Sequence, residues 1–354
     1  MQKVLAKIYL KNIRRNAQAF GRLTGRPVCA VVKANAYGHG AEEVVCALEG
    51  VVSCFAVSLV SEAIAIRTAA CGKDILVLTP PLCEEETLVG ARNGFVLTVG
   101  DLATARRVAE TAEKNRLPVR VHIKTNTGMN RYGTNVQTLG RICTHLKAHP
   151  LVRVEGVYSH IYGNTRAQAE RQRERFMRMI AVCRDYYPEA IAHLGATYGA
   201  ILGEKFVFDM TRIGIGLYGY LPDGARDLDE KRVRKLDLKK GMAVYATVAA
   251  KRKYVCGGAG YGKDIAKPTG ERLITCRFGY ADGFLRTKEN GTDGSGDNAN
   301  DLCMDACVRW GNAPKGERVP VMTDAAETAK KAGTISYEVL CAATRRAETE
   351  YDYE

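Results

Sequence analysis

A single lysine, Lys33, stands at the end of a short run of small and branched apolar residues. The segment AVVKANAYGHG, residues 30–40, follows this lysine with glycines, an asparagine, a tyrosine and a histidine. The run VCAVV predicts a buried strand, because branched side chains pack well on a pleated surface. An ammonium group at the end of such a strand is costly unless it is paired or loses its proton. Two interpretations are open: a lysine whose head reaches water, or one that forms an imine with an aldehyde cofactor.

Short apolar runs recur along the first two thirds of the chain, with helix-like segments between them. The predicted strands are 28–33, 54–60, 75–78, 95–99, 119–124, 154–160, 191–195 and a last run within 210–220. Amphipathic pieces such as TARRVAETAEKN separate them, which is the pattern of βα units around a parallel sheet. Eight such strands favour an α/β fold of the (β/α)₈ TIM-barrel type. In such a barrel the catalytic residues lie at the carboxyl ends of the strands. Lys33 lies at the carboxyl end of the first predicted strand.

The pattern changes after a charged stretch at 221–241, which is typical of a linker. Beyond it lie the short alternating runs MAVYATVAA, ERLITCRF, CVRW and RVPVMT, separated by glycine-rich turns that include a loop at 288–301. This texture predicts a mainly β C-terminal domain. We therefore expect a barrel over residues 1–235 and a β domain over 236–354.

Composition excludes several classes of protein. The 354 residues are 46% hydrophobic, and no apolar stretch approaches the ~20 residues that a membrane helix needs. The charged N-terminal segment does not resemble a signal peptide. The 12 cysteines form neither a zinc pattern nor a small disulfide framework, so we expect reduced thiols, no metal and a cytoplasmic protein.

The formal charge of +13 raises the question of a nucleic-acid partner, but no recognition motif accompanies it. Many of the arginines lie in 166–187, where Phe176, Ile180 and Cys183 mark an apolar helical stripe. We expect a solvated basic surface that can attract an anionic ligand, and neither nucleic acid nor membrane as a partner.

The motif around Lys33 closely resembles the pyridoxal-phosphate attachment motif of the alanine racemase family. Further motifs of that family follow in order: KTNTGMNRYG (124–133), VYSHIYG (157–163), TRIGIGLYGY (211–220), GYG (260–262), GYADGFLR (279–286) and CMDA (303–306). The resemblance implies a pyridoxal 5'-phosphate enzyme that interconverts L- and D-alanine and supplies D-alanine for peptidoglycan. It also implies a homodimer whose active sites lie across the interface.

The resemblance assigns a role to each matching residue. Lys33 matches the lysine that holds the cofactor and acts as one base, and Tyr261 matches the second base, which the partner subunit supplies. The matching cofactor contacts are Tyr37, His160, Thr197, Arg212, Gly214 and Ile215. The matching substrate contacts are Arg131, Met304 and Asp305. Two bases suit the reaction, because racemisation removes a proton from one face of Cα and returns it on the other.

Arg212 matches the residue that faces the pyridine nitrogen, and a guanidinium cannot accept a proton there. The ring nitrogen then stays neutral, which stabilises the carbanion less and favours prompt reprotonation. A basic amino-acid decarboxylase on a similar barrel would need a carboxylate at this position, so Arg212 argues against that alternative. A non-catalytic pyridoxal-phosphate-binding barrel would lack the β domain and the motifs around Tyr261 and Met304.

The chain departs from the family pattern at several positions. Asn126 replaces the usual acid beside Lys124, a lysine that some relatives carry in carbamylated form, and the state of Lys124 stays open. The segments ATYG and GTISYEVL resemble a branch of serine/alanine racemases, which leaves serine open as a substrate beside alanine. The family's late phosphate-binding tyrosine aligns with Arg345, and Tyr351 or Tyr353 could replace it.

Overall fold

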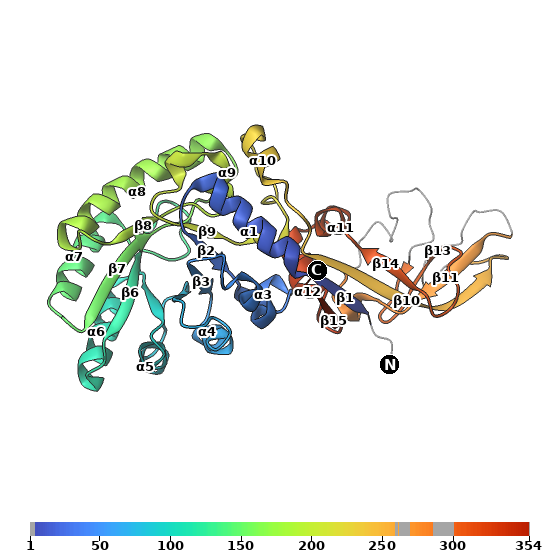
Figure 1. Cartoon of the computed structure of the whole chain (residues 1–354), viewed down its shortest axis with the longest axis horizontal. Helices are drawn as coiled ribbons and strands as arrows, with labels where there is room; N and C mark the ends of the chain where they lie inside the picture. The colour runs from blue at the N-terminus through green and yellow to red at the C-terminus, as the bar shows by residue number, and fades with distance from the viewer. Residues whose placement is uncertain (1–3, 259–260, 262–269, 286–300, 354) are drawn as a thin grey trace. The chain divides into compact units, whose positions relative to one another are not determined.

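The computed structural model describes residues 4–258, 261, 270–285 and 301–353 (Figure 1). The chain divides into two compact units. The barrel unit comprises Asn12–Ala36 and Gly40–Lys239, and the strand unit comprises Met1–Lys11, Tyr37–His39 and Lys240–Glu354. In the described residues no helix is both long and apolar enough to cross a membrane.

Eight parallel strands form the sheet of the barrel unit in the order β8-β7-β6-β5-β4-β3-β2-β9 (Figure 1). Their bounds are β2 (Val28–Val31), β3 (Cys54–Val57), β4 (Ile75–Val77), β5 (Val96–Val99), β6 (Val119–Lys124), β7 (Val152–Tyr158), β8 (Ile191–His193) and β9 (Thr211–Ile213). The Arg212 N–H donates to the Gly195 carbonyl at 3.0 Å, which joins β9 to the segment after β8. The predicted (β/α)₈ fold and all eight predicted strand positions are confirmed.

Helices surround the strands of this unit. They are α1 (Leu10–Thr24), α3 (Ala41–Leu48), α4 (Val60–Ile66), α5 (Glu84–Arg92), α6 (Leu102–Asn115), α7 (Val136–Lys147), α8 (Arg166–Tyr186), α9 (Thr197–Leu202) and α10 (Glu230–Leu236). Side-chain caps begin four of them: Asp101 accepts from Thr104 N, Asn135 from Thr138 N, Thr165 from Gln168 N, and Asp229 from Arg232 N. The stretch 221–241, which we expect to be a linker, contains the short helix α10, and Asp229 caps it.

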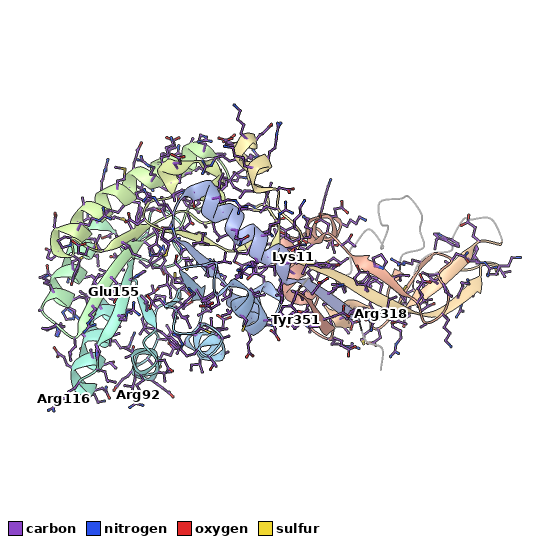
Figure 2. All side chains as sticks on the ribbon, viewed as in Figure 1. Lys11, Arg92, Arg116, Glu155, Arg318 and Tyr351 are labelled. Carbon is purple, nitrogen blue, oxygen red and sulfur yellow. The ribbon has the colours of Figure 1, made fainter. Side chains whose placement is uncertain are left out.

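The basic excess lies partly on exposed helix ends. Arg92 ends α5 and Arg116 caps α6 (Figure 2). Cations at helix C-termini are favourable because they face the negative end of the helix dipole. On α8 the predicted stripe of Phe176, Ile180 and Cys183 is buried.

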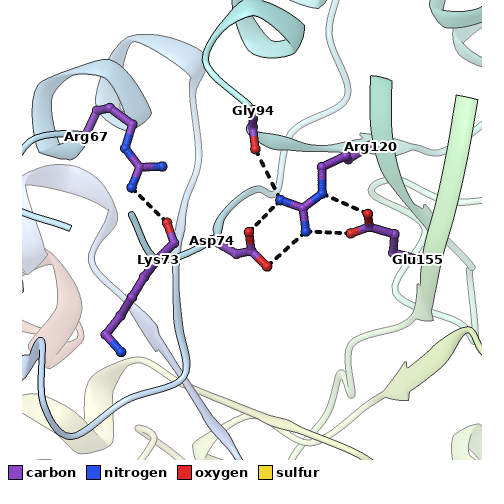
Figure 3. Close-up of polar contacts among 6 residues, drawn as sticks. All are labelled: Arg67, Lys73, Asp74, Gly94, Arg120 and Glu155. Carbon is purple, nitrogen blue, oxygen red and sulfur yellow. Dashed lines mark hydrogen bonds and ion pairs between the residues drawn. The ribbon is translucent and has the colours of Figure 1, made fainter. Parts of the chain in front are cut away.

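An ion-pair network ties the amino ends of three barrel strands together (Figure 3). Arg120 of β6 donates to Glu155 of β7 through Nε and Nη2, each at 2.8 Å, and to Asp74 before β4 through Nη1 at 2.5 Å and Nη2 at 2.9 Å. Paired carboxylates in this fork geometry hold the guanidinium at a fixed position. The network lies at the end of the barrel opposite to the carboxyl ends of its strands.

Within its described residues the strand unit contains a seven-stranded sheet in the order β12-β13-β11-β10-β1-β15, with β14 paired to β10. The strands are β1 (Leu5–Tyr9), β10 (Met242–Lys253), β11 (Arg272–Cys276), β12 (Asp301–Leu302), β13 (Cys307–Trp310), β14 (Arg318–Met322) and β15 (Glu348–Asp352). The helices α11 (Ala325–Ala332) and α12 (Ser336–Ala342) complete it. Figure 2 labels Arg318 on β14 and Tyr351 on β15. Most of the loop expected at 288–301 lies outside the described residues.

Candidate active site

Val32 separates Lys33 from the end of β2, and Lys33 begins a short left-handed turn, α2 (Lys33–Tyr37). The residues with positive φ are Ala34 (52°), Asn35 (52°), Ala36 (54°) and Tyr37 (53°). Each left-handed residue other than glycine costs about 1–2 kcal/mol, so surrounding bonds must hold the turn. Glu62 accepts from Ala34 N at 2.7 Å, and the Asn35 side chain accepts from Ala41 N at 2.8 Å. The turn that begins at Lys33 is therefore strained, and these two hydrogen bonds stabilise it.

Four basic side chains from different parts of the barrel unit lie close enough to His160 for their charges to act on it. The pKa of His160 lies well below its ordinary 6.5, first because the ring is desolvated and then because of the nearby positive charges. These charges belong to Arg212, Lys124, Arg131 and Lys33. The structure thus brings Lys33, Arg131, His160 and Arg212 of the predicted site together, and it keeps the imidazole neutral between them.

Arg212 is buried, with 3% of its surface exposed. Nη1 donates to His193 Nδ1 at 2.6 Å and to the His193 carbonyl at 2.9 Å. Nη2 donates to the carbonyls of Ser159 at 2.6 Å and Leu194 at 3.3 Å. These four bonds use both terminal nitrogens, so the Nε–H remains as the fifth donor of the guanidinium. Every partner is neutral, and desolvation lowers the Arg212 pKa.

A chain of hydrogen bonds extends from Arg212 into the barrel interior. His193 Nδ1 must accept from the arginine, so His193 carries its proton on Nε2. Nε2 then donates to His122 Nδ1 at 2.9 Å, which assigns the proton of His122 to its own Nε2. Burial lowers the pKa of His122 to about 3, in agreement with this neutral chain. The guanidinium orientation is therefore set by two neutral imidazoles of defined tautomer.

Lys124 ends β6 inside the barrel, where 6% of its surface is exposed. Its Nζ donates to the Thr125 carbonyl at 2.8 Å and lies 5.1 Å from the centre of the Tyr158 ring. Desolvation, aided by the charges of Arg212 and Arg131, lowers its pKa from 10.5 to about 7. The amine is thus poised between its charged and neutral forms near neutral pH.

Asn126 organises the loop that carries Arg131. Its Oδ1 accepts from Gly128 N at 2.9 Å and from Asn130 N at 3.1 Å. Its Nδ2 donates to Asn130 Oδ1 at 2.8 Å. The amide therefore gives this loop its shape without adding a negative charge beside Lys124.

The predicted phosphate contacts of the barrel unit meet at two adjacent turns. Thr197 Oγ1, at the start of α9, accepts from Gly216 N at 3.2 Å. A Cβ on Gly216 would lie 2.5 Å from the Phe20 ring, so only glycine allows this approach. Among the described residues, neither the Gly214 nor the Ile215 N–H donates a backbone hydrogen bond. Two unpaired N–H groups beside a hydroxyl are a suitable cradle for an anion.

Tyr37 belongs to the strand unit, where it is buried. Its ring lies 5.9 Å from that of Tyr337, which is on α12. Desolvation and the neighbouring Tyr337 raise the pKa of Tyr37, so its hydroxyl stays protonated at neutral pH. A protonated hydroxyl is a donor that an anion can use.

The remaining predicted residues also lie in the strand unit and are exposed there. Tyr261 has 81% of its surface exposed and Met304 has 54%. The residues on either side of Tyr261, 259–260 and 262–269, lie outside the described part of the chain. Asp305 follows Met304 in a turn between β12 and β13. Exposure at these positions suits residues that contact a small molecule or a second protein chain.

Three residues near the C-terminus are relevant to the role of the late phosphate-binding tyrosine, and they differ in exposure and in secondary structure. Arg345 is exposed after α12, and Tyr353 has 68% of its surface exposed. Tyr351 lies on β15, opposite Ile8 of β1. The role of each in phosphate binding stays a prediction.

Three residues of the site were missed by the sequence analysis: Tyr158, His193 and His122. Tyr158 stacks on His193 with ring centres 4.9 Å apart, and its hydroxyl bonds to Thr98 Oγ1 at 2.8 Å. A usable signal exists in VRVHIK, because His122 and Lys124 are two apart and share the inner face of their strand. No such alternation marks the short strand of His193.

Comparison with known proteins identifies the family. Residues 8–222 match "Alanine racemase, N-terminal domain" and residues 242–351 match "Alanine racemase, C-terminal domain". An alanine racemase of Streptococcus pneumoniae is 31% identical over 97% of this chain and 96% of its own length. One from Clostridium tetani is 28% identical over 99% of this chain and 96% of its own length. The solved alanine racemase of Clostridium difficile 630 has a TM-score of 0.87 at 27% identity, covering 99% of this chain and 96% of that one. The chain belongs to the alanine racemase family, a family of isomerases.

Proposed function

We propose that the protein is a pyridoxal-phosphate-dependent racemase that interconverts L- and D-alanine with Lys33 and Tyr261 as its two bases. The observation that carries this proposal is the buried Arg212, which is held by neutral acceptors and acts by its charge, as Lys33 does, on the same His160 imidazole. Its cellular role is to supply D-alanine for peptidoglycan in the cytoplasm, and it acts as a homodimer.

The residues present suit pyridoxal phosphate. Near the neutral His160 imidazole the barrel unit places Arg212, Arg131, Lys33 and the partly protonated Lys124, a surplus of positive charge that an anionic ligand balances. The N–H groups of Gly214 and Ile215 and the Thr197 hydroxyl would hold the phosphate, with the Tyr37 hydroxyl as a further donor. Lys33 Nζ would hold the aldehyde carbon, and Arg212 Nε–H would face the ring nitrogen.

The cofactor, when bound, withdraws electrons from the amino acid attached to it and makes the Cα hydrogen acidic. Arg212 limits this effect, because its guanidinium donates a hydrogen bond but cannot accept the ring proton. His193 and His122 keep the guanidinium in place through their fixed tautomers. A moderate electron sink suits proton exchange at Cα better than bond cleavage elsewhere in the amino acid.

Two groups move the proton in this proposal. Lys33 Nζ removes or returns it on one face of Cα, and Tyr261 Oη from a second copy of the chain does so on the other. Arg131, Met304 and Asp305 bind and orient the amino acid, whose carboxylate suits a guanidinium.

Serine is the second candidate substrate. Asn126, in place of the usual acid, shapes the loop that carries Arg131, and Arg345 stands in place of the late tyrosine. The Asn126 difference falls in the loop of the proposed contact Arg131, and the segments ATYG and GTISYEVL resemble the serine/alanine branch.

Turnover of both enantiomers of alanine and of serine tests the proposal directly. We expect the purified protein to be yellow and to equilibrate L- and D-alanine. A protein that binds the cofactor and racemises neither amino acid would instead be the non-catalytic alternative. Rescue of a D-alanine-requiring bacterium tests the cellular role.

A further inference from the structure

In the strand unit, the turn at 279–283 supports the loop that carries Met304 and Asp305. Tyr280 N donates to the Cys303 carbonyl, and Ala281 N donates to the Met304 carbonyl, each at 3.1 Å. Cys303 N in turn donates to the Ala306 carbonyl at 2.8 Å, which closes the loop on itself. Backbone hydrogen bonds alone thus hold this loop against the turn.

Two glycines allow the turn to fit between its neighbours. A Cβ on Gly279 would lie 2.2 Å from the Met304 carbonyl oxygen. A Cβ on Gly283 would lie 1.9 Å from the Ala342 carbonyl oxygen, at the end of α12. Backbone this close on both sides leaves the turn little freedom to move, so it is a rigid support for the loop.

Arg346 forms one ion pair with the turn and another with the loop. The Asp282 side chain is 7% exposed, and its Oδ2 accepts from Gly279 N at 2.8 Å. Arg346 Nε lies 3.3 Å from Asp282 Oδ1, and Arg346 Nη1 donates to Asp305 Oδ1 at 2.8 Å. A buried carboxylate requires a cationic partner, so Asp282 determines where the guanidinium lies. The same guanidinium then determines where the more exposed Asp305 lies.

We propose that Arg346 is a positioning residue for the substrate, which fixes Asp305 and the adjacent Met304 through the buried carboxylate of Asp282. The inference rests on the proposed function, in which these two residues contact the amino acid. Arg346 forms ion pairs with Asp282 and with Asp305, a proposed substrate contact, so the proposal assigns it to substrate binding and not to proton transfer. Its loss therefore raises KM and leaves kcat and cofactor binding in place.

The experiment compares R346M with R346K and with the control R318M, which changes an exposed arginine on β14 of the same unit. We expect R346M to raise the KM for alanine roughly tenfold, as for the loss of a charge-assisted hydrogen bond. The kcat and the visible cofactor absorbance should stay close to those of the parent. R346K should recover part of the affinity, since an ammonium reaches one carboxylate but lacks the fork. R318M should match the parent.

A double-mutant cycle with D305N shows whether Arg346 acts through Asp305. In that case R346M raises KM much less in the D305N background than in the parent. Four results would each overturn the positioning role. They are fully additive effects of R346M and D305N on KM, an unchanged KM in R346M, a fall in kcat at unchanged KM in R346M, and an equal defect in R318M. If circular dichroism shows that R346M does not fold, R346K and D305N are compared with the parent instead. An unchanged KM in both of these variants then overturns the positioning role. A parent protein that racemises neither alanine nor serine overturns the proposed function instead.

Discussion

Replacing the buried Lys124 by methionine should make the barrel unit more stable at neutral pH and change how its stability depends on pH. Folding lowers the Lys124 pKa from 10.5 to about 7. Between these values the unfolded chain binds a proton that the folded chain does not, so stability rises with pH across this window. Below pH 7 both states are protonated and the folded state bears the whole cost of the buried charge.

The size of the effect follows from the shift. A difference of about 3.5 pKa units corresponds to about 5 kcal/mol at 1.36 kcal/mol per unit. Lys124→Met removes this contribution, so its stability advantage over the parent should shrink by about 3 kcal/mol between pH 6.5 and pH 9.5. The lost bond to the Thr125 carbonyl lowers the stability of the variant equally at all pH values and does not affect this difference.

Urea unfolding followed by far-UV circular dichroism, in carbonate-free buffer at several pH values, measures the difference. Lys231→Met is the matched control, because Lys231 is an exposed lysine on α10 of the same unit. A stability difference between parent and Lys124→Met that stays constant from pH 6.5 to pH 9.5 would refute the reasoning. Lys124 would then be either solvated or chemically modified in the folded protein.

Further predictions concern the cofactor, the second base and the dimer. Lys33→Ala should abolish both the visible cofactor absorbance and racemisation, and a borohydride-reducible adduct on another lysine would contradict the assignment. Tyr261→Phe should keep the absorbance and lose about 10²–10⁴-fold in racemisation, the usual contribution of a general acid or base; parental rates in both directions would rule it out as a base. Mixing inactive Lys33→Ala and Tyr261→Ala proteins should restore part of the activity, because each heterodimer then holds one site with both defects and one with neither. No recovery despite demonstrated subunit exchange would place Tyr261 in its own subunit's site.

Most of the barrel was predictable because its strands are local features. Branched apolar runs bounded by polar or glycine residues mark β2 through β7 clearly in the sequence, and the helices between them have their own caps. The strand unit was less predictable. β1 pairs with β10 and with β15, two strands from distant parts of the chain, and nothing in LAKIY indicates those partners. Pairing depends on contacts across the sheet, which local pattern does not encode.

The residues of the candidate site also differ in whether the sequence alone reveals them. Lys33, Arg131, His160 and Arg212 were recognisable from motifs, because each lies in a short stretch of distinctive residue types. Arg346 was not, since its partners Asp282 and Asp305 are 64 and 41 residues away and the arginine lies in an ordinary polar segment. Its relevance depends on the burial of Asp282, a property of the folded unit alone.

The sequence by itself determined the barrel class, the lysine at the first barrel strand and the presence of an arginine where a carboxylate would serve other chemistry. Residue identity decides these points, because an arginine cannot accept a proton in any fold. Tertiary structure decided the protonation states. His193 and His122 are 71 residues apart, yet their hydrogen bond and that of Arg212 assign both tautomers. Lys124 titrates near neutral pH only because folding takes its amine out of water and places it beside other cations.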